Sequence, residues 1–365
     1  MENYPKLKVD ITKFRENYRA INNLCKDQGI EVAFVMKGCN GLPKIVEAAI
    51  DEGAKIIGTS RLQQFKTLGE NFNRATKLLL RIPMPSEVKD AVKWTDMTLA
   101  SDMTILKLLN EEAANLGKTY EVILMADLGD LREGFWASNS LIDASFAVEN
   151  SFDNLHLAGI GTNLGCYGAV KSTPEKMNQL LDLKEQVEKA IGRKLKYISG
   201  GQTTALPLVY KKEMPKGINM LRIGEAILLG RDMPELFNCP VSNTHNDVFV
   251  LESQLAEISE KPSYPVGEIV SDCFGLVPEF KDKGMIIHGI VGGGKVDYGY
   301  SDMLEPMESG IEILGASSDH TILDLTEISK ERTLKVGDVL RFKLSYANIV
   351  HLCSKGDLAI EYVGE

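Results

Sequence analysis

Residues 32–38 read VAFVMKG, a short apolar run that ends in a lysine and a glycine. The apolar residues are continuous and do not alternate with polar ones, which is typical of a strand buried on both faces. Comparable runs recur up to about residue 230 and are rich in Val, Ile and Leu. These runs are Lys55–Gly58, Lys77–Ile82, Asp96–Ala100, Glu121–Asp127, His156–Gly161, Leu195–Ser199 and Asn219–Gly224.

Helical patterns separate these runs. One begins at Pro43, another follows Ser101, and a third begins at Thr173–Pro174, a capping threonine before a proline at the first helical position. Eight strands, each followed by a helical segment, predict a (β/α)8 barrel over residues 12–230. A doubly wound sheet is the alternative, but no strand is followed by a GxGxxG turn that opens a helix.

The pattern changes after Arg231, where helical periodicity fades and β-branched runs dominate. Examples are VFVLESQLAEI (248–258), MIIHGIVGG (285–293), TILDLT (321–326) and VGDVLRFKLSY (336–346). They predict a second, C-terminal antiparallel β domain over residues 231–365. The alternating N-terminal segment, residues 4–11, is expected to add a strand to it. The chain is therefore predicted to be α/β, a barrel with a β domain.

Composition excludes several classes of protein. The net charge is −10, from 51 acidic and 41 basic residues, which argues against a nucleic-acid or anionic-membrane surface. No apolar run is long enough to span a bilayer, and the charged N-terminus does not resemble a signal peptide. Six scattered cysteines and five histidines show no disulfide framework or metal-ligand spacing, so we expect a cytoplasmic protein without a metal.

The candidate functional residues follow the predicted strands, because active sites of such barrels lie at the carboxyl ends of the strands. A lysine, two arginines and several small or hydroxyl residues meet there. This set suits an anionic, aromatic ligand such as a phosphorylated cofactor. Each residue alone also has an ordinary interpretation, as a solvated charge or a turn. The residues are Lys37, Asp127, Arg132, Asn163, Gly200–Thr204 and Arg222–Gly224.

Two features leave alternatives open. Arg222 lies in an otherwise apolar strand, where a buried guanidinium needs partners, so a structural ion pair and a ligand contact are both possible. Residues 289–295 fit the phosphate-binding pattern GxxxxGK, but Val296 stands where a magnesium-binding Ser or Thr is needed. A bent strand or hairpin is the better interpretation of this glycine-rich segment.

The order of the motifs resembles the alanine-racemase family of pyridoxal-phosphate (PLP) enzymes, and most of all its ornithine-racemase branch. The resemblance extends over nearly the whole chain. It implies PLP as the cofactor and an amino-acid racemase, an isomerase, as the activity. The motifs that carry it are VAFVMKG, IIGTSR, VILMADLGDLREG, GIGTNLGCYG, ISGG, LRIGEAILLGR and GIEILGASSDH.

The resemblance also implies roles for individual residues. Lys37 matches the lysine that carries the cofactor and acts as one catalytic base. Arg222 matches the arginine that faces the pyridine nitrogen, and Arg132 one near the phenolic oxygen and the substrate carboxylate. The other cofactor-binding positions are Asn163 beside the ring and Gln202, Thr203, Gly224 and Glu225 at the phosphate.

The chain departs from alanine racemase at four positions. Met125 replaces a lysine that is often carbamylated, so Arg132 must be held in another way. Gly41 replaces a tyrosine, which we expect to leave room for a longer substrate. Asn163 replaces a histidine. The second-domain tyrosine base has no clear counterpart, and a gapless reading places Lys295 there, with His320 and Tyr298 as further candidates.

These matches lead to a specific expectation, a racemase that exchanges the α-proton between two bases on a basic amino acid, ornithine first. A homodimer with shared active sites is expected, because the second base should come from a partner's β domain. Three alternatives remain. A PLP decarboxylase normally has a carboxylate where Arg222 stands, and a D-threonine-aldolase-like enzyme needs a metal. A non-catalytic PLP carrier resembles the barrel alone. The acids considered for the substrate ammonium are Asp130, Glu133, Asp297, Asp302 and Asp319.

Overall fold

The computed structural model describes residues 3–69 and 72–364 and divides into two compact units. Residues 15–244 form one, the barrel unit. The chain up to residue 14 and from residue 245 forms the other, the β unit. The barrel unit ends at residue 244, later than the expected residue 230. The reason is that α10 (Asp232–Glu235) and the buried Cys239 follow the last barrel strand within this unit.

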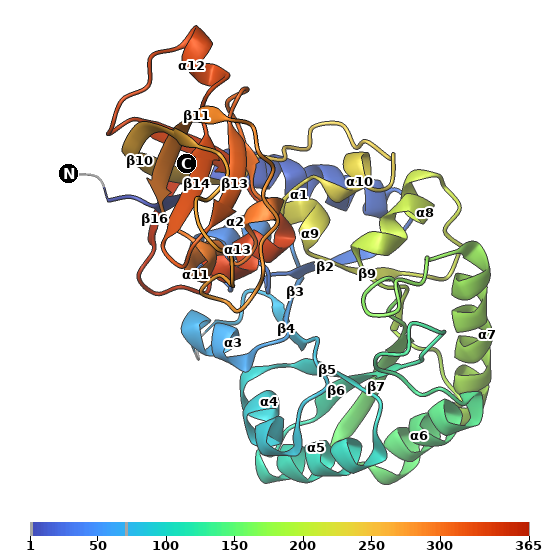
Figure 1. The fold of residues 1–365 in the computed structure, drawn as a ribbon. Helices are drawn as coiled ribbons and strands as arrows, with labels where there is room; N and C mark the ends of the chain where they lie inside the picture. Colours follow the sequence, from blue (N-terminus) through green and yellow to red (C-terminus); the bar gives the residue numbers. More distant parts are fainter. Residues whose placement is uncertain (1–2, 70–71, 365) are drawn as a thin grey trace. The chain divides into compact units, whose positions relative to one another are not determined.

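Eight parallel strands close the barrel, which confirms the predicted fold (Figure 1). The apolar runs form these strands because both of their faces are covered, and Ile56, Leu99 and Ile123 meet in the interior core. Gly159 allows two strands to approach closely, since a Cβ there would lie 2.0 Å from Tyr197 O. The strands are β2 (Glu31–Val35), β3 (Ile56–Thr59), β4 (Thr76–Leu79), β5 (Met97–Ala100), β6 (Tyr120–Met125), β7 (Leu155–Gly161), β8 (Tyr197–Ser199) and β9 (Met220–Ile223).

Helices follow most of these strands. The predicted cap of α7 is confirmed, since Thr173 Oγ1 accepts a hydrogen bond from Lys176 N at 3.3 Å and Pro174 is the first helical residue. Further helices are α1 (Ile11–Lys26), α2 (Pro43–Asp51), α3 (Leu62–Leu68), α4 (Val88–Trp94), α5 (Met103–Asn115), α6 (Ser138–Ser151), α7 (Pro174–Ile191), α8 (Leu206–Tyr210) and α9 (Glu225–Leu228), with 3-10 turns η1 (Pro85–Glu87) and η2 (Thr203–Ala205).

The β unit is a mostly antiparallel sheet of eight strands, as predicted, and the N-terminal strand joins it. β1 pairs antiparallel with β10 and parallel with β16. The strands are β1 (Lys6–Asp10), β10 (Phe249–Pro262), β11 (Met285–Gly292), β12 (Glu305–Pro306), β13 (Glu312–Ala316), β14 (His320–Asp324), β15 (Val339–Lys343) and β16 (Ala359–Val363). Short helices η3 (Ser301–Met303), α11 (Lys295–Tyr298), α12 (Ile328–Glu331) and α13 (Tyr346–Leu352) accompany them.

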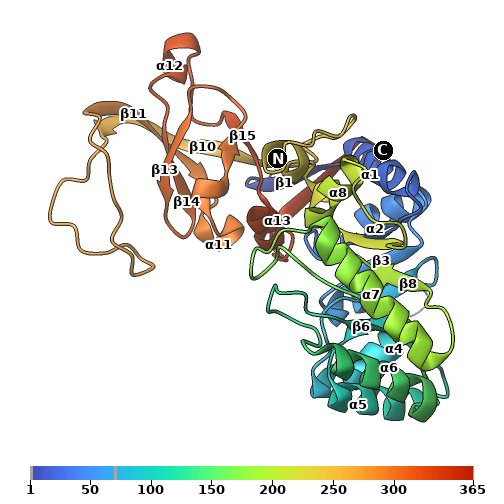
Figure 2. The ribbon, with the colours of Figure 1, turned by 90° about the vertical axis from the view of Figure 1, so that its right-hand side faces the viewer.

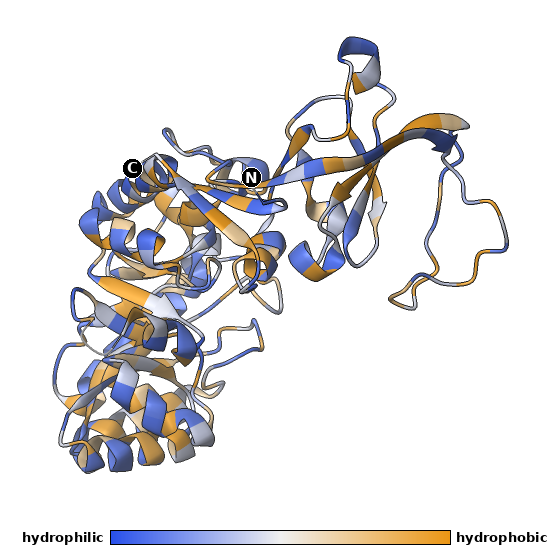
Figure 3. Cartoon of the chain, turned by 90° about the vertical axis from the view of Figure 1, so that its left-hand side faces the viewer, coloured by the Kyte–Doolittle hydropathy of each residue, from blue (hydrophilic) through white to orange (hydrophobic). Residues whose placement is uncertain are grey.

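A long segment without helix or strand, residues 263–284, connects β10 and β11, and we call it the arm. It extends away from the sheet of its own unit (Figure 2), and hydrophobic residues recur along it (Figure 3). Val266 is 91% exposed and Val277 is 69% exposed. The arm therefore carries apolar surface that its own unit does not bury.

Across residues 3–69 and 72–364, the structure has no helix that is both long and apolar enough to cross a membrane.

Candidate active site

Lys37 follows β2 at the carboxyl end of the barrel, and its side chain is half-buried. Burial is the main cause that lowers the pKa of its amine, and Arg132 lowers it further. Cys166, Glu133 and Glu225 oppose this shift. Among the described residues, Lys37 Nζ has no hydrogen-bond or ion-pair partner. Burial disfavours the ammonium form, so Lys37 offers an amine at the strand ends that no described residue engages.

Arg222 lies on β9 and is only 4% exposed. Its guanidinium donates to Ser199 Oγ, to Thr162 O at 2.9 Å and to Asn163 Oδ1 at 3.4 Å. Burial lowers its pKa to about 10, and it forms no ion pair with any described residue. Of the two alternatives that the sequence left open, the structural ion pair is therefore wrong. Arg222 is a buried cation with neutral partners.

Two polar atoms beside Arg222 have no partner of their own. Thr162 Oγ1 and Asn163 Nδ2 are buried without a hydrogen bond. A buried polar atom without a partner costs about 1–3 kcal/mol. Both atoms follow β7, in the turn whose other atoms hold Arg222. This turn is thus prepared for a polar ligand.

The exit of β8 is tied to the exit of β7 by side chains. Gln202 Nε2 and Thr204 Oγ1 donate to Leu164 O at 3.3 and 2.8 Å. Thr203 is buried, and its hydroxyl accepts from Ala226 N at 3.4 Å at the start of α9. Gln202 therefore has a structural contact, whereas Thr203 lies where a phosphate would meet the first turn of a helix.

Gly224 and Glu225 follow β9. A Cβ at Gly224 would lie 2.9 Å from Val35 O, so only glycine fits between these strands. The Glu225 side chain is hydrogen-bonded to Asp232, and burial raises the pKa of both carboxyl groups. The Glu225 side chain is thus engaged within the protein, and the part of this residue suited to an anion is its backbone N–H.

Arg132 follows β6, and residues other than position 125 hold its side chain. Met125 is fully buried in the barrel core. Arg132 pairs with Glu133, and its NH1 donates to Cys166 Sγ at 2.7 Å. Cys166 could not be recognised from the sequence as a site residue, because a cysteine without spaced partners has no recognisable signal.

Two acids that were considered for binding a substrate ammonium are engaged elsewhere. Asp130 is 1% exposed, and its carboxylate accepts four backbone hydrogen bonds, from Gly165, Cys166, Tyr167 and Val170. Asp297 Oδ1 binds Lys355 Nζ at 2.8 Å, and its Oδ2 accepts from a backbone N–H at 2.9 Å. That interpretation of Asp130 and Asp297 is therefore wrong.

The structure limits the space that the absence of a side chain at Gly41 leaves. Gly41 has a φ of +66°, which favours glycine, and a Cβ there would lie 3.1 Å from Gln64 Cβ. Gln64 is buried and bonded to Asn40 Oδ1 at 2.8 Å. The space beside Gly41 is filled by the protein.

The candidates for a second base lie in the β unit. Lys295 begins α11, with Nζ 3.2 Å from Asp272 Oδ2 and 4.7 Å from the Phe274 ring. His320 is exposed at the start of β14. Tyr298 is fully buried, its hydroxyl is 2.5 Å from Thr321 Oγ1, and burial raises its pKa to about 12. Tyr298 is thus a core residue, and Lys295 and His320 have the accessible nitrogens.

The strand-end residues fit PLP. A buried donor-only guanidinium suits the ring nitrogen as an acceptor, the unpartnered Asn163 Nδ2 and Thr162 Oγ1 suit polar substituents, and Lys37 supplies an amine. Thr203 and the backbone of Gly224 to Ala226 suit a phosphate. Within the described ranges there is no group of three His, Cys, Asp or Glu side chains arranged to hold a metal ion.

The chain is similar to known proteins over nearly its whole length. A family model described as alanine racemase, N-terminal domain, matches residues 9–232. The chain is 38% identical to an ornithine racemase of Acetoanaerobium sticklandii, over 95% of this chain and 96% of that protein. It is 36% identical to a lysine racemase of Thermotoga maritima, over 94% of each chain. An alanine racemase structure from Streptomyces lavendulae has the same fold, with a TM-score of 0.76 at 17% identity, covering 100% of this chain and 98% of that one.

Proposed function

The chain belongs to the alanine racemase family, and we propose that it is a PLP-dependent racemase that interconverts the L and D forms of a basic amino acid. The observation that carries the proposal is the presence of an unengaged lysine amine and a buried arginine at the barrel's strand ends. Lys37 has an unengaged amine, and Arg222 is buried without a carboxylate. A decarboxylase of this fold would instead present a carboxylate at the position of Arg222.

The residues divide the work of racemisation as follows. PLP, when bound, delocalises the electron pair that remains on the substrate Cα after the α-proton leaves. Lys37 Nζ takes or returns that proton on one face. Arg222 only donates hydrogen bonds, so it holds the pyridine nitrogen unprotonated. Arg132 binds the substrate carboxylate. A second base on the opposite face completes the inversion.

The second base is proposed to be Lys295, with His320 as the alternative. Both side chains are nitrogen bases outside the core of the β unit, unlike Tyr298. Lys295 pairs with Asp272 as an ammonium, so it must leave Asp272 and lose a proton before it can act as a base. The pair is half-buried, so its separation costs about 1 kcal/mol.

Ornithine, and next lysine, are the proposed substrates. The two relatives of high identity over nearly the full chain are an ornithine racemase and a lysine racemase. Of the acids considered for a distal ammonium, Asp130, Asp297 and Glu133 are engaged, which leaves Asp302 and Asp319.

The test is a substrate screen with the purified protein and added PLP. Polarimetry would follow L-ornithine, L-lysine, L-arginine, L-serine and L-alanine, and carbon dioxide release would be recorded in parallel. We expect kcat/KM for ornithine or lysine to exceed that for alanine at least tenfold, because alanine lacks the distal charge. Equal or better turnover of alanine contradicts the substrate proposal, and carbon dioxide release without inversion supports the decarboxylase.

A homodimer in the cytoplasm is part of the proposal. The exposed apolar residues of the arm provide surface for a second copy, and all six cysteines are thiols. Sedimentation of the wild type against a variant with Val266→Asp and Val277→Asp tests the first point. We expect the variant to shift toward monomer. An unchanged mass would exclude the arm from the interface.

A further inference from the structure

Asp130 acts as an internal anion for the loop after β7. Its buried carboxylate accepts from Gly165 N at 2.9 Å, Cys166 N at 3.3 Å, Tyr167 N at 2.9 Å and Val170 N at 3.2 Å. Consecutive backbone N–H groups that point inward form a concave site for an anion. Here the chain fills that site with its own carboxylate, and residues 165–170 fold around it.

The packing of this loop leaves it little freedom. Gly165 has a φ of +71°, and a Cβ there would lie 2.8 Å from Thr204 Cγ2. A Cβ at Gly168 would lie 2.7 Å from the backbone oxygen of Asp130. Both glycines are therefore required by close approach. The loop is a rigid support whose position relative to β6 depends on Asp130.

Cys166 connects this support to Arg132. Arginine only donates hydrogen bonds, so the Cys166 sulfur accepts the bond from Arg132 NH1 at 2.7 Å. The other partner of Arg132 is Glu133, its neighbour in the chain, which moves with it. Among the described residues, only Cys166 contacts Arg132 from a different strand exit. Of the two contacts, Cys166 is the one that can fix Arg132 relative to the barrel.

We propose that Asp130 and Cys166 are positioning residues: Asp130 folds the 165–170 loop, and the loop holds the Cys166 sulfur against Arg132, which sets where a substrate carboxylate binds. This inference rests on the proposed function for the role of Arg132. Both Arg132 and Cys166 act electrostatically on Lys37, so the device lies beside the amine that handles the proton. A displaced Arg132 would misplace the substrate Cα relative to that amine.

The first test uses Asp130→Asn, with Asp102→Asn as the matched control. Asp102 also accepts two backbone N–H bonds, from Thr104 and Ile105, but in the cap of α5. The side-chain amide introduced by Asp130→Asn would turn a donor toward the N–H groups of the loop. In the cofactor-free protein we expect amide hydrogen exchange at residues 165–170 to become at least tenfold faster in Asp130→Asn and to stay unchanged in the control. Unchanged protection overturns the role of Asp130.

The second test separates positioning from stability with Cys166→Ala and Cys166→Ser. Cys166 is exposed, so neither change opens a cavity, and the thermal midpoint should stay at the wild-type value. For the best amino acid of the substrate screen, we expect KM to rise about tenfold in Cys166→Ala, with a smaller change in kcat. In Cys166→Ser the hydroxyl can still accept a hydrogen bond, so we expect a smaller rise in KM. A wild-type KM in Cys166→Ala overturns the proposal. If the wild type racemises no amino acid, the proposed function fails, while the exchange experiment still decides the role of Asp130.

Discussion

Lys37 and Arg222, at the strand ends of the barrel, differ from the lysines of the β unit that form ion pairs. In the barrel unit, Arg222 is buried among neutral acceptors, and Lys37 is half-buried with no bonded partner among the described residues. In the β unit, lysines bind carboxylates of their own unit. Lys355 lies 2.8 Å from Asp297, Lys295 3.2 Å from Asp272, and Lys283 3.3 Å from Asp324.

The difference indicates where a ligand is needed. Half-exposed ion pairs each contribute about 0–1 kcal/mol to folding stability, and their charges already have partners within the protein. A buried cation without an acid lowers the stability of the folded chain, and such a conflict is expected at functional sites. The partners that Lys37 and Arg222 lack inside the protein are those that a cofactor and a substrate would supply.

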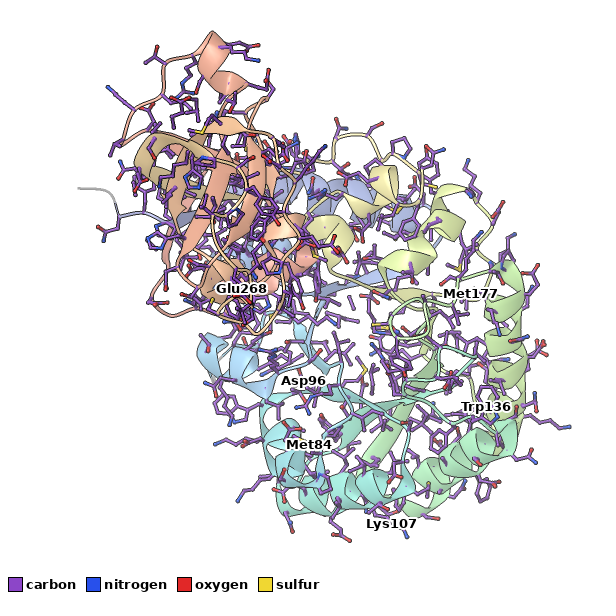
Figure 4. The ribbon with its side chains drawn as sticks, viewed as in Figure 1. Met84, Asp96, Lys107, Trp136, Met177 and Glu268 are labelled. Atoms are coloured by element: carbon purple, nitrogen blue, oxygen red, sulfur yellow. The ribbon has the colours of Figure 1, made fainter. Side chains whose placement is uncertain are left out.

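The sharpest way to break this comparison is Lys37→Ala. We expect racemisation to fall by at least about 10⁴-fold, and the visible absorbance of lysine-bound PLP to disappear, because no other amine replaces it at the end of β2. Lys107→Ala, on the outer helix α5 (Figure 4), should behave as the wild type. A visible spectrum unchanged by the mutation, and still bleached by borohydride, would remove Lys37 from the mechanism.

Lys295→Ala tests whether one paired cation of the β unit is also catalytic. If it is the second base, inversion should fall about 10²–10⁴-fold. Exchange of the α-proton in D2O should persist for one enantiomer, since Lys37 still serves its own face. Lys283→Ala, another ion-paired lysine, is the control. If both enantiomers still exchange their α-proton and inversion stays at the wild-type rate, Lys295 is not the second base. His320→Ala would then be the next variant to measure.

Arg222→Glu tests the buried cation itself. A carboxylate would favour a protonated pyridine nitrogen and a stronger electron sink, so we expect the amine form of the cofactor to accumulate faster than in the wild type. The release of pyridoxamine phosphate, followed by chromatography, measures this effect. Accumulation no faster than in the wild type would show that Arg222 does not face the ring nitrogen.

The smallest expected effect is on the pH dependence of stability in the cofactor-free protein. Burial holds the pKa of Lys37 below the 10.5 of an unfolded chain. Between the folded pKa and 10.5 the unfolded chain binds more protons, so the free energy of unfolding should rise with pH in that window. Lys37→Met, measured by denaturant titration, should lack this part of the slope. Identical slopes would mean that the amine is not desolvated.

Much of the barrel unit could be predicted from the sequence, because burial on both faces leaves continuous apolar runs that local composition records. The same holds for the cap at Thr173. In the β unit, β13 and β16 were missed, since Glu312–Ala316 contains a glycine and neither strand forms a long apolar run. Family membership followed from motif order, and the comparisons confirm it.

The sequence by itself determined the barrel strands and their carboxyl ends, and therefore which residues could meet a cofactor: Lys37, Arg132 and Arg222. Only the tertiary structure decided which polar groups were already engaged. Asp130 and Gln64 are hydrogen-bonded to residues about 35 and 24 positions away in the chain. Cys166, which follows β7, contacts Arg132, which follows β6. Such contacts depend on distance in space after folding, and a local pattern carries no record of that distance.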